Sequence, residues 1–376
     1  MLHRSQALHA LMRGHRAVAV AGTNGKTTTS SMLTVLLQHA GLDPSFAIGG
    51  ELVGAGTNGH HGSGDVFVAE ADESDSSFLV YRPQVSVVTN VQADHLDHYG
   101  TADAVVTAFE AFADLLGPTG LLVACLDDEG SAALAARAGA MGRRVLTYGT
   151  APAASVRAHE LVFDQGMARF SLSENGSDIG RVALRVPGHH NVLNATAAYA
   201  VARELGVPPE AAIGGLEGFS GTRRRFEPRG NAGGVRVFDD YAHNPAKVAA
   251  AVATGRQVAG LGRLVVVFQP HLYSRTVEFA AEFGAALSSA DEVVVMDVYA
   301  AREDPVPGVT GALVADHVDL PADRVAYVPS WSAVADEVAR RAVPGDLVLT
   351  VGAGDVTMVG REVLGRLASR RAEGKR

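Results

Sequence analysis

The sequence has little cysteine and lacks a long uninterrupted hydrophobic run. Its 376 residues include one cysteine, Cys125, which excludes an intrachain disulfide framework and fits a reducing compartment. No hydrophobic run approaches the roughly 18 residues needed to span a bilayer. His and Arg interrupt the amino-terminal segment MLHRSQALHALMRGHR, where a signal peptide needs an unbroken apolar stretch. These absences predict a cytoplasmic protein that is neither secreted nor inserted in a membrane.

Positive charge is also scarce. Against 41 Asp and Glu the chain has 32 Lys and Arg, which gives a net charge of −9 and no basic footprint for nucleic acid. An anionic ligand would therefore have to be held by local donors. Lysine occurs at positions 26, 247 and 375 alone, so Lys26 stands by itself in its half of the chain. The length and the 47% hydrophobic content predict two globular units, each with its own core.

The hydrophobic pattern predicts an α/β fold. Short apolar runs without polar alternation are typical of strands in a parallel sheet covered by helices, and in the first half they fall at 17–21, 66–69, 85–89, 121–125 and 145–148. Between 155 and 186 the pattern alternates, with turn residues between three segments, which predicts a small antiparallel meander. A second α/β series has expected strands at 235–239, 264–268, 292–296, 325–328 and 347–351. The segment GLEGFSGTRRRFEPRGNAGG between the two series is the predicted domain boundary.

The stretch VAVAGTNGKTTTSSM, residues 18–32, joins a predicted strand to a predicted helix through glycine, lysine and hydroxyl residues. It satisfies the second half of the phosphate-loop pattern G-x-x-x-x-G-K-[ST], but Val20 replaces the first glycine. Helix-start amides, an ammonium group and a hydroxyl are the groups that bind phosphates and Mg²⁺. We therefore predict a phosphate site made by Gly22, Thr23, Asn24, Gly25, Lys26, Thr27 and Thr28. The alternative is an ordinary turn whose threonines cap the helix.

Two polar clusters follow expected strands, EADESDSS from residue 70 and NVQADHLDHYG from residue 90. Ligands of open α/β sheets bind at that edge. Because Mg²⁺ prefers oxygen, we predict that Thr27 and Glu70 hold it together with nucleotide phosphates, with Glu73 as the alternative carboxylate. His95 is predicted to reach a second metal ion or to orient the transferring phosphate. Asp72 and Asp75 are interpreted as loop or helix-cap residues, and no Cys/His spacing favours zinc.

Seven segments together resemble the Mur ligases, in order and over essentially the whole chain: GTNGKTTT, AEADESDSSFL, TNVQADHLDHYG, PGHHNVLNATAA, TRRRFE, DDYAHNP and QPHLYSRT. Within the family, QPHLYSRT and EADESD are most similar to the members that join L-alanine to UDP-N-acetylmuramate. The resemblance implies a P-loop-type central ATPase domain at 17–222 and a Rossmann-like C-terminal domain at 223–376. Residues 1–16 resemble a linker helix.

The resemblance also implies an activity, with ATP and Mg²⁺ as cofactors. In the family, a substrate carboxylate attacks the γ-phosphate of ATP, and an amino acid amine then displaces phosphate from the acyl phosphate to form an amide, in the synthesis of peptidoglycan precursors. The chemistry is reasonable because phosphate is a far better leaving group than a carboxylate oxygen, so that catalysis requires mainly positioning and charge neutralisation.

The site residues implied by the resemblance fall in both domains. Lys26 would hold the phosphates, and Thr27, Glu70 and His95 the magnesium ions. On the adenine side the matching residues are His190, Asn191 and Asn194, although Asn191 also suits a helix cap. Arg225 and Asp240 match residues that reach ATP, and Tyr241 matches a base-stacking position. His271 and Arg275 match the amino-acid side, where a guanidinium can pair with an α-carboxylate, an ordinary surface arginine being the alternative for Arg275.

Two departures from the family bear on the function. No lysine occurs between Lys26 and Lys247, which excludes the carbamylated lysine that several Mur ligases carry near the second magnesium ion. The family's amino-terminal UDP-binding domain is expected to be absent, through an internal or misassigned start or a genuine truncation, and ligase activity of this polypeptide alone is expected to be weak. The alternatives are a Mur-like ligase that uses another acid or a partner chain, and a non-catalytic ATP-binding module.

Overall fold

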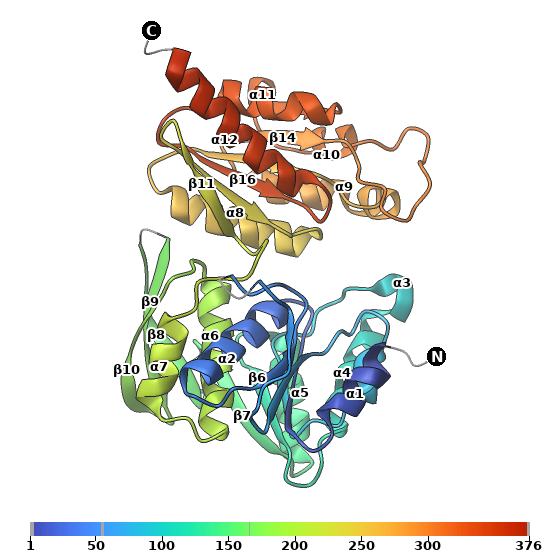
Figure 1. The fold of residues 1–376 in the computed structure, drawn as a ribbon. Helices are drawn as coiled ribbons and strands as arrows, with labels where there is room; N and C mark the ends of the chain where they lie inside the picture. Colours follow the sequence, from blue (N-terminus) through green and yellow to red (C-terminus); the bar gives the residue numbers. More distant parts are fainter. Residues whose placement is uncertain (1–3, 54–55, 165, 374–376) are drawn as a thin grey trace. The chain divides into compact units, whose positions relative to one another are not determined.

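The computed structural model describes residues 4–53, 56–164 and 166–373. The chain forms two compact units, Met1–Thr222 (unit 1) and Arg223–Arg376 (unit 2). Each unit has a sheet with helices on both of its faces (Figure 1). The α/β fold class predicted from the hydrophobic pattern is therefore confirmed.

Unit 1 contains a ten-stranded sheet in the order β10-β9-β8-β7-β6-β5-β1-β4-β2-β3. The strands from β7 to β2 in this order pair in parallel, as expected for the uninterrupted apolar runs. The strands of the whole sheet are β1 (Arg16–Ala21), β2 (Ser45–Ala47), β3 (Gly59–His60), β4 (Val66–Glu70), β5 (Val85–Val88), β6 (Leu121–Cys125), β7 (Arg144–Gly149), β8 (Val156–Asp164), β9 (Met167–Glu174) and β10 (Ser177–Leu184).

The helices of unit 1 pack on the two faces of this sheet. Alternation along β1 shows how the core divides: Val18 and Val20 pack in the cluster with α2, α6 and α7, whereas Ala17, Ala19 and Ala21 pack in the cluster with α4 and α5. The helical segments are α1 (Arg4–Met12), α2 (Lys26–His39), η1 (Ser77–Val80), α3 (Leu96–Tyr99), α4 (Ala102–Asp114), α5 (Glu129–Ala140), α6 (His189–Glu204) and α7 (Pro209–Glu217).

The antiparallel meander predicted for residues 155–186 is confirmed. Strands β8, β9 and β10 pair antiparallel, and β8 joins the parallel part of the sheet through Tyr148 and Val156. The short strands β2 and β3 were not predicted, because strands of three and two residues are too short to show a periodic pattern. The first three residues of the expected linker lie outside the described residues, and α1 forms in the remainder of it.

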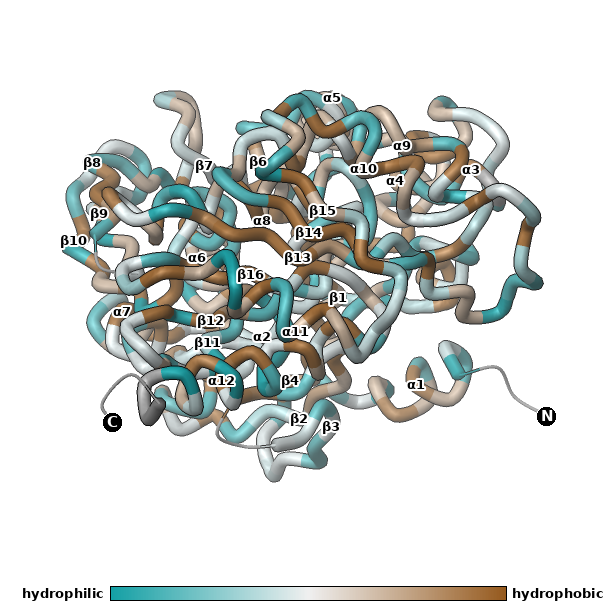
Figure 2. The backbone as a smooth tube through the Cα atoms, turned by 90° about the horizontal axis from the view of Figure 1, so that it is seen from above, coloured by the Kyte–Doolittle hydropathy of each residue, from teal (hydrophilic) through white to brown (hydrophobic). Residues whose placement is uncertain are grey.

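Unit 2 contains a six-stranded sheet in the order β11-β12-β16-β13-β14-β15. All its pairs are parallel except that of β11 with β12. The strands are β11 (Glu227–Ala232), β12 (Val235–Asp240), β13 (Leu264–Phe268), β14 (Glu292–Met296), β15 (Val325–Val328) and β16 (Leu347–Val351). Figure 2 shows the hydrophobic character of β13 and β14, whose residues between Leu264 and Phe268 and between Val293 and Met296 are buried.

Helices cover both faces of this second sheet as well. Helices α8, α9 and α10 share one buried cluster with strand side chains, and α11 and α12 share the other. The helical segments are α8 (Pro245–Ala259), α9 (Tyr273–Leu287), α10 (Ala312–Ala315), η2 (Ala322–Arg324), α11 (Trp331–Arg341) and α12 (Val356–Glu373).

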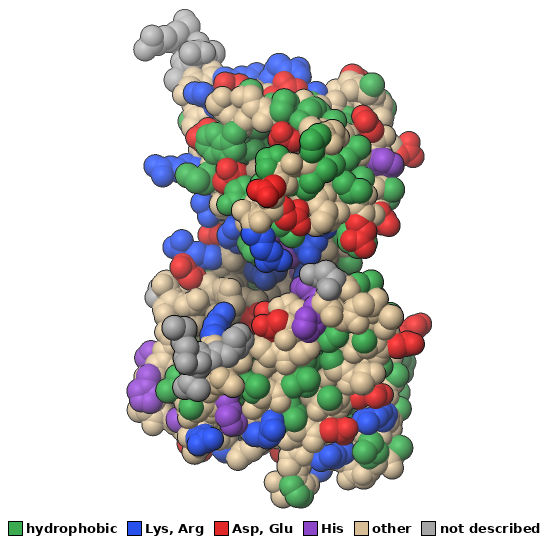
Figure 3. Space-filling view, turned by 90° about the vertical axis from the view of Figure 1, so that its right-hand side faces the viewer, with side chains coloured by type: hydrophobic (Ala, Val, Ile, Leu, Met, Phe, Trp, Pro, Cys, Tyr) green, Lys and Arg blue, Asp and Glu red, His purple; other side chains and the backbone are tan. Residues whose placement is uncertain are grey.

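The surface carries charges of both signs. In the face shown in Figure 3, hydrophobic side chains lie between acidic and basic ones on each unit. Large exposed hydrophobic residues of unit 1 come from separate elements, for example Leu11, Val106 and Met141. Among the helices of the described ranges, none combines the length and the apolar character that a membrane span requires.

Candidate active site

The predicted phosphate loop joins β1, which ends at Ala21, to α2, which begins at Lys26. Gly22 and Gly25 have φ angles of 135° and 87°, values that favour glycine. A Cβ atom on Gly22 would overlap Thr89 Oγ1, and one on Gly25 would lie 2.6 Å from Asn194 Oδ1. The loop is therefore packed so closely from behind that glycine is required at both positions.

The loop is fastened to the segment that follows β5. The backbone of Asn24 donates to Asn90 Oδ1 at 2.7 Å, and the carbonyl of Asn24 accepts from Asn90 Nδ2 at 3.0 Å and from Thr89 Oγ1 at 2.5 Å. Thr23 also donates its amide to the Asn90 carbonyl at 3.1 Å. Thr89 and Asn90 were not singled out from the sequence, although they belong to the quoted segment TNVQADHLDHYG. They hold the backbone of the loop in one conformation.

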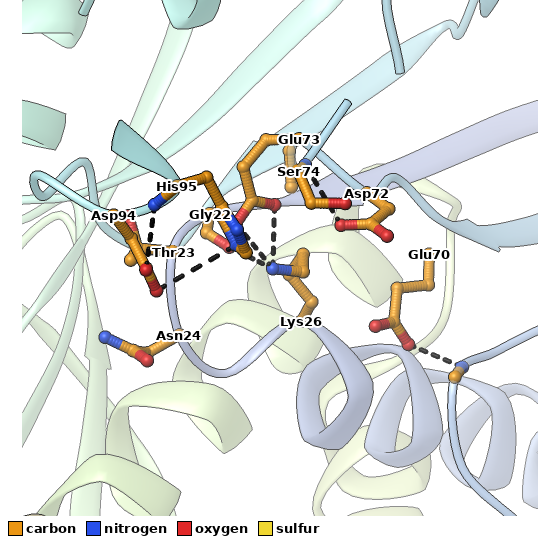
Figure 4. Close-up of polar contacts among 12 residues, drawn as sticks. Gly22, Thr23, Asn24, Lys26, Glu70, Asp72, Glu73, Ser74, Asp94 and His95 are labelled. Carbon is orange, nitrogen blue, oxygen red and sulfur yellow. Dashed lines mark hydrogen bonds and ion pairs between the residues drawn. The ribbon is translucent and has the colours of Figure 1, made fainter. Parts of the chain in front are cut away.

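Lys26 lies in the middle of this arrangement (Figure 4). Its Nζ donates to the Gly22 carbonyl at 2.8 Å and to Glu73 Oε1 at 2.8 Å, and Glu73 Oε2 is 2.7 Å away. The Glu73 side chain is 2% exposed. Glu73 was predicted as the alternative magnesium ligand, and in the structure its carboxylate contacts the phosphate-loop lysine.

Thr27 and Glu70 lie together on neighbouring elements. The Thr27 hydroxyl donates to Glu70 Oε1 at 3.0 Å, and the other carboxylate oxygen accepts from the Gly49 amide at 2.6 Å. Hydroxyl and carboxylate oxygens are ligands that Mg²⁺ accepts, so this donor set fits the ion. Within the part of the chain that the structure describes, no three His, Cys, Asp or Glu side chains group as a metal site. A magnesium ion held here would thus need further oxygens, such as those of phosphates.

His95 lies on the Glu73 side of the site, at the start of α3. Its Nε2 is 3.8 Å from Glu73 Oε1 and 3.9 Å from Asp94 Oδ2. Figure 4 shows Lys26, Glu73 and His95 converging, with Glu70 apart from them. Asp72 accepts from the Ser74 amide at 3.2 Å, within the loop that follows β4. Asp75 accepts in the same way from the Ser77 amide at 2.9 Å.

The two asparagines assigned to the adenine side lie behind the phosphate loop, on α6. Asn194 Oδ1 accepts from the Thr29 hydroxyl at 3.1 Å, and Asn191 Nδ2 donates to the Pro187 carbonyl at 2.6 Å. Both asparagines are 5% exposed. Asn194 thus joins α6 to α2, and Asn191 bonds the segment just before α6. His190 is exposed at the start of the same helix.

The predicted nucleotide residues of unit 2 also lie together. The Asp240 carboxylate accepts from the amides of Phe226 and Ala242, each at 2.8 Å, and burial raises its pKa. The Arg225 guanidinium lies 5.5 Å from the centre of the Tyr241 ring, and that of Arg224 lies 4.8 Å from it. The Tyr241 ring is therefore already in contact with two cations.

Arg224 is a structural residue that the sequence reading missed. Its guanidinium donates to the carbonyls of Gly352 at 2.7 Å and Gly354 at 3.1 Å, in the turn between β16 and α12. Its Nε lies 3.5 Å from Asp239, a fully buried carboxylate that also accepts from two threonine hydroxyls. Three consecutive arginines after the domain boundary gave a signal for this region, but they did not indicate which one is anchored.

His271 lies just before α9 and Arg275 lies in its first turn. Arg275 donates to the carbonyl of His243 at 3.2 Å, and the His271 ring lies 6.0 Å from the His243 ring. His271 also stacks on Tyr299, with ring centres 5.9 Å apart. His243 and Tyr299 were missed, although His243 belongs to the quoted segment DDYAHNP.

Burial disfavours the charged form of both histidines. Burial, followed by the charge of Lys247, lowers the pKa of His243 to about 3. Burial, followed by the charge of Arg275, also lowers the pKa of His271. Because the Tyr241 carbonyl lies 2.9 Å from His243 Nδ1, that nitrogen carries the proton of the neutral ring and donates it. The Nε2 of His243 is then an acceptor at neutral pH.

Comparison with known proteins covers both units. Residues 20–202 match the Mur ligase middle domain, and residues 224–354 match the Mur ligase, glutamate ligase domain. A UDP-N-acetylmuramate–L-alanine ligase of Kineococcus radiotolerans is 61% identical over 370 residues, which are 98% of this chain and 78% of that protein. The ligase of the same name from Saccharopolyspora erythraea is 56% identical over 366 residues, 97% of this chain and 74% of that protein.

A solved structure is similar over the same extent. The UDP-N-acetylmuramate-alanine ligase MurC from Thermotoga maritima superposes with a TM-score of 0.79 at 29% identity, covering 97% of this chain and 78% of that one. The identity and the coverage exceed what a shared fold alone would give. The chain therefore belongs to the Mur ligase family.

Proposed function

We propose that this chain is an ATP-dependent ligase of peptidoglycan precursor synthesis that joins L-alanine to UDP-N-acetylmuramate. The observation that carries the proposal is the phosphate loop, where the Lys26 ammonium group bonds the Gly22 carbonyl and the next residue, Thr27, bonds Glu70 at the end of β4. The relatives at 61% and 56% identity, both named UDP-N-acetylmuramate–L-alanine ligase, support the two substrates.

The reaction has two steps. A carboxylate oxygen of the muramyl substrate attacks the γ-phosphorus of ATP, the bond to the β,γ-bridging oxygen breaks, and ADP leaves. The amine of L-alanine then attacks the acyl carbon, the carbon–oxygen bond to phosphate breaks, and the nitrogen loses a proton as the amide forms. The first step moves negative charge from one oxygen to another, and the second leaves it on the departing phosphate, so that fixed cations and precise positioning supply the catalysis.

Unit 1 would position the phosphates. The amides at the start of α2 and the Lys26 ammonium group are the donors that this chain offers to them. Mg²⁺, when bound, would neutralise phosphate charge, and the oxygens of Thr27 and Glu70 would hold it. His95 is proposed to serve a second ion or the transferring phosphate from the Glu73 side.

Unit 2 would bind the amino acid and make part of the contacts with the nucleotide. Arg275 at the start of α9 can pair with the α-carboxylate of L-alanine through two hydrogen bonds. His271 is proposed to lie on the same amino-acid side. The contacts of Tyr241 with two arginines and of Asp240 with two backbone amides support a fixed platform for the nucleotide, to which Arg225 would contribute.

The proposal is tested by phosphate release and by the mass of the product. ATP and Mg²⁺ are supplied throughout, while UDP-N-acetylmuramate and L-alanine are added singly and together, with glycine and L-serine as replacements for L-alanine. The Kineococcus radiotolerans relative serves as the positive control under the same conditions. We expect release to require both substrates and to yield the alanyl product. Release that is indifferent to both substrates would indicate an ATPase without ligation and would overturn the proposal.

A further inference from the structure

Glu73 is a buried carboxylate inside the phosphate site. Its side chain is 2% exposed and lies between Lys26 Nζ, 2.7 Å from Oε2, and His95 Nε2, 3.8 Å from Oε1. The Glu73 carbonyl accepts hydrogen bonds from the Tyr99 hydroxyl at 2.5 Å and from the Ser76 amide at 3.1 Å. Because the backbone is anchored in this way, the carboxylate has little freedom to leave Lys26.

The contact between Lys26 and Glu73 uses the ammonium group that the proposed function assigns to phosphates. Lys26 donates to Glu73 Oε1 and to the Gly22 carbonyl, so two of its three N–H groups are engaged within the protein. Glu73 Oε2 is buried and in ionic contact with Lys26, yet it accepts no hydrogen bond. One oxygen of the carboxylate is thus held by charge alone.

A phosphate that enters the loop changes the interaction between Lys26 and Glu73. It attracts Lys26 and repels Glu73, and like charges at short range are costly in a site with little water. A ligand that brings its own cation offsets the repulsion, whereas a phosphate ligand without a cation has to compete with Glu73 for Lys26. The burial of Glu73 makes that competition stronger than it would be for a solvent-exposed carboxylate.

We infer that Glu73 is a positioning residue that holds Lys26 in the nucleotide-free protein, and that it makes the phosphate loop favour magnesium-loaded nucleotide over nucleotide without metal. The inference rests on the proposed function, because it assumes that Lys26 exchanges Glu73 for a phosphate. It differs from a role for Glu73 as a magnesium ligand, which would make the carboxylate necessary for binding of the loaded nucleotide.

The test is the affinity for ADP in the presence of EDTA, measured by calorimetry at fixed ionic strength. Glu73→Gln keeps the shape of the side chain and removes its charge. We expect it to bind metal-free ADP about tenfold more tightly than the wild type, because Lys26 no longer has to leave a carboxylate. Asp72→Asn is the matched control, since Asp72 is an exposed acid one residue away and its loss should change the affinity less than about twofold.

The other outcomes are distinct. Unchanged or weaker binding of metal-free ADP by Glu73→Gln overturns the inference, and a loss confined to ADP with Mg²⁺ would identify Glu73 as a metal ligand. If the wild type binds neither ADP nor ATP with or without Mg²⁺, the proposed function fails together with the inference. The thermal midpoint of each variant, measured without nucleotide, separates a change of affinity from a loss of folded protein.

Discussion

Asn194 lies directly behind Gly25, so that a Cβ atom on Gly25 would be 2.6 Å from Asn194 Oδ1. The same oxygen accepts from the Thr29 hydroxyl one turn into α2. Helix α6 therefore supports the phosphate loop from its buried side, and the loop amides can meet a ligand only from the opposite side. The conformation of the loop is set by a contact between two helices that are far apart in the sequence.

Replacing Gly25 with alanine should reduce nucleotide binding at least tenfold. The added methyl group meets the Asn194 side chain, and the φ angle of 87° strains any residue other than glycine. Gly41→Ala is the control at the other end of α2. Its φ angle is 78°, and a Cβ there has no neighbour within 4 Å, so it should cost about 1 kcal/mol of stability and leave the ADP affinity unchanged. Equal losses of affinity in the two variants would contradict the role of the Asn194 contact.

The sequence predicted the strands well where burial dominates. Expected strands 264–268 and 347–351 coincide with β13 and β16, because five consecutive buried residues, apolar except for Thr350, leave little choice of structure. Strand β11 was not predicted, because Pro228 and Gly230 within it are typical of loops. An edge position tolerates both residues, and the register shift of β11 falls between them.

The site was harder to predict, because neighbouring residues of one chemical type compete for each role. Glu70 and Glu73 are three residues apart, and only the structure shows that Glu70 contacts Thr27 whereas Glu73 contacts Lys26. Arg224 and Arg225 raise the same difficulty. Side-chain direction in an irregular segment depends on backbone angles, such as the φ of 58° at Arg224, and no sequence pattern encodes them. The roles assigned to these residues remain predictions.

Replacing Lys26 with methionine should destabilise unit 1 as well as abolish ATP turnover. The substitution leaves Glu73 buried without its cation, which costs about 3–5 kcal/mol when one partner of a buried pair is removed. The double variant Lys26→Met, Glu73→Gln should regain most of that stability and still lack turnover. Urea unfolding followed by far-ultraviolet circular dichroism at pH 8 measures the stability of the single and the double variant relative to the wild type. A single variant as stable as the wild type would show that the pair contributes no stability.

Lowering the pH should reduce the stability of unit 2, because His243 is protonated in the unfolded chain. Burial lowers the pKa of this histidine from 6.5 to about 3, so the folded state stays neutral while the unfolded chain takes up a proton below pH 6.5. The contribution is present above pH 6.5 and is lost as the pH falls towards 3, by about 2 kcal/mol between pH 6.5 and 5. The fluorescence of the single tryptophan, Trp331 in α11, reports the unfolding of unit 2.

His243→Gln provides the comparison for this pH dependence. His271 also has a pKa lowered by burial, and it is present in both proteins, so the difference between wild type and variant isolates His243. We expect the free energy of unfolding of the variant to fall less steeply between pH 6.5 and 5. Parallel pH profiles for the two proteins would mean that His243 takes up its proton equally in the folded and unfolded states, and would contradict a neutral His243 beside Arg275 at pH 5.

Arg224 should contribute more to the stability of unit 2 than an exposed arginine does. Arg224→Met removes the donors to the Gly352 and Gly354 carbonyls and the cation next to fully buried Asp239, with an expected loss of about 2–4 kcal/mol. Arg361→Met, at an exposed position on α12, should cost less than about 0.5 kcal/mol.

Arg224→Lys separates charge from geometry at this position. The ammonium group keeps a cation near Asp239, but a lysine cannot match the planar guanidinium fork that reaches two carbonyls of one turn. We expect a stability between those of Arg224→Met and the wild type, measured through Trp331 fluorescence in urea. If the lysine variant is as stable as the wild type, charge alone accounts for the contribution of Arg224. If it is no better than methionine, the carbonyl contacts between the domain boundary and the turn before α12 account for all of it.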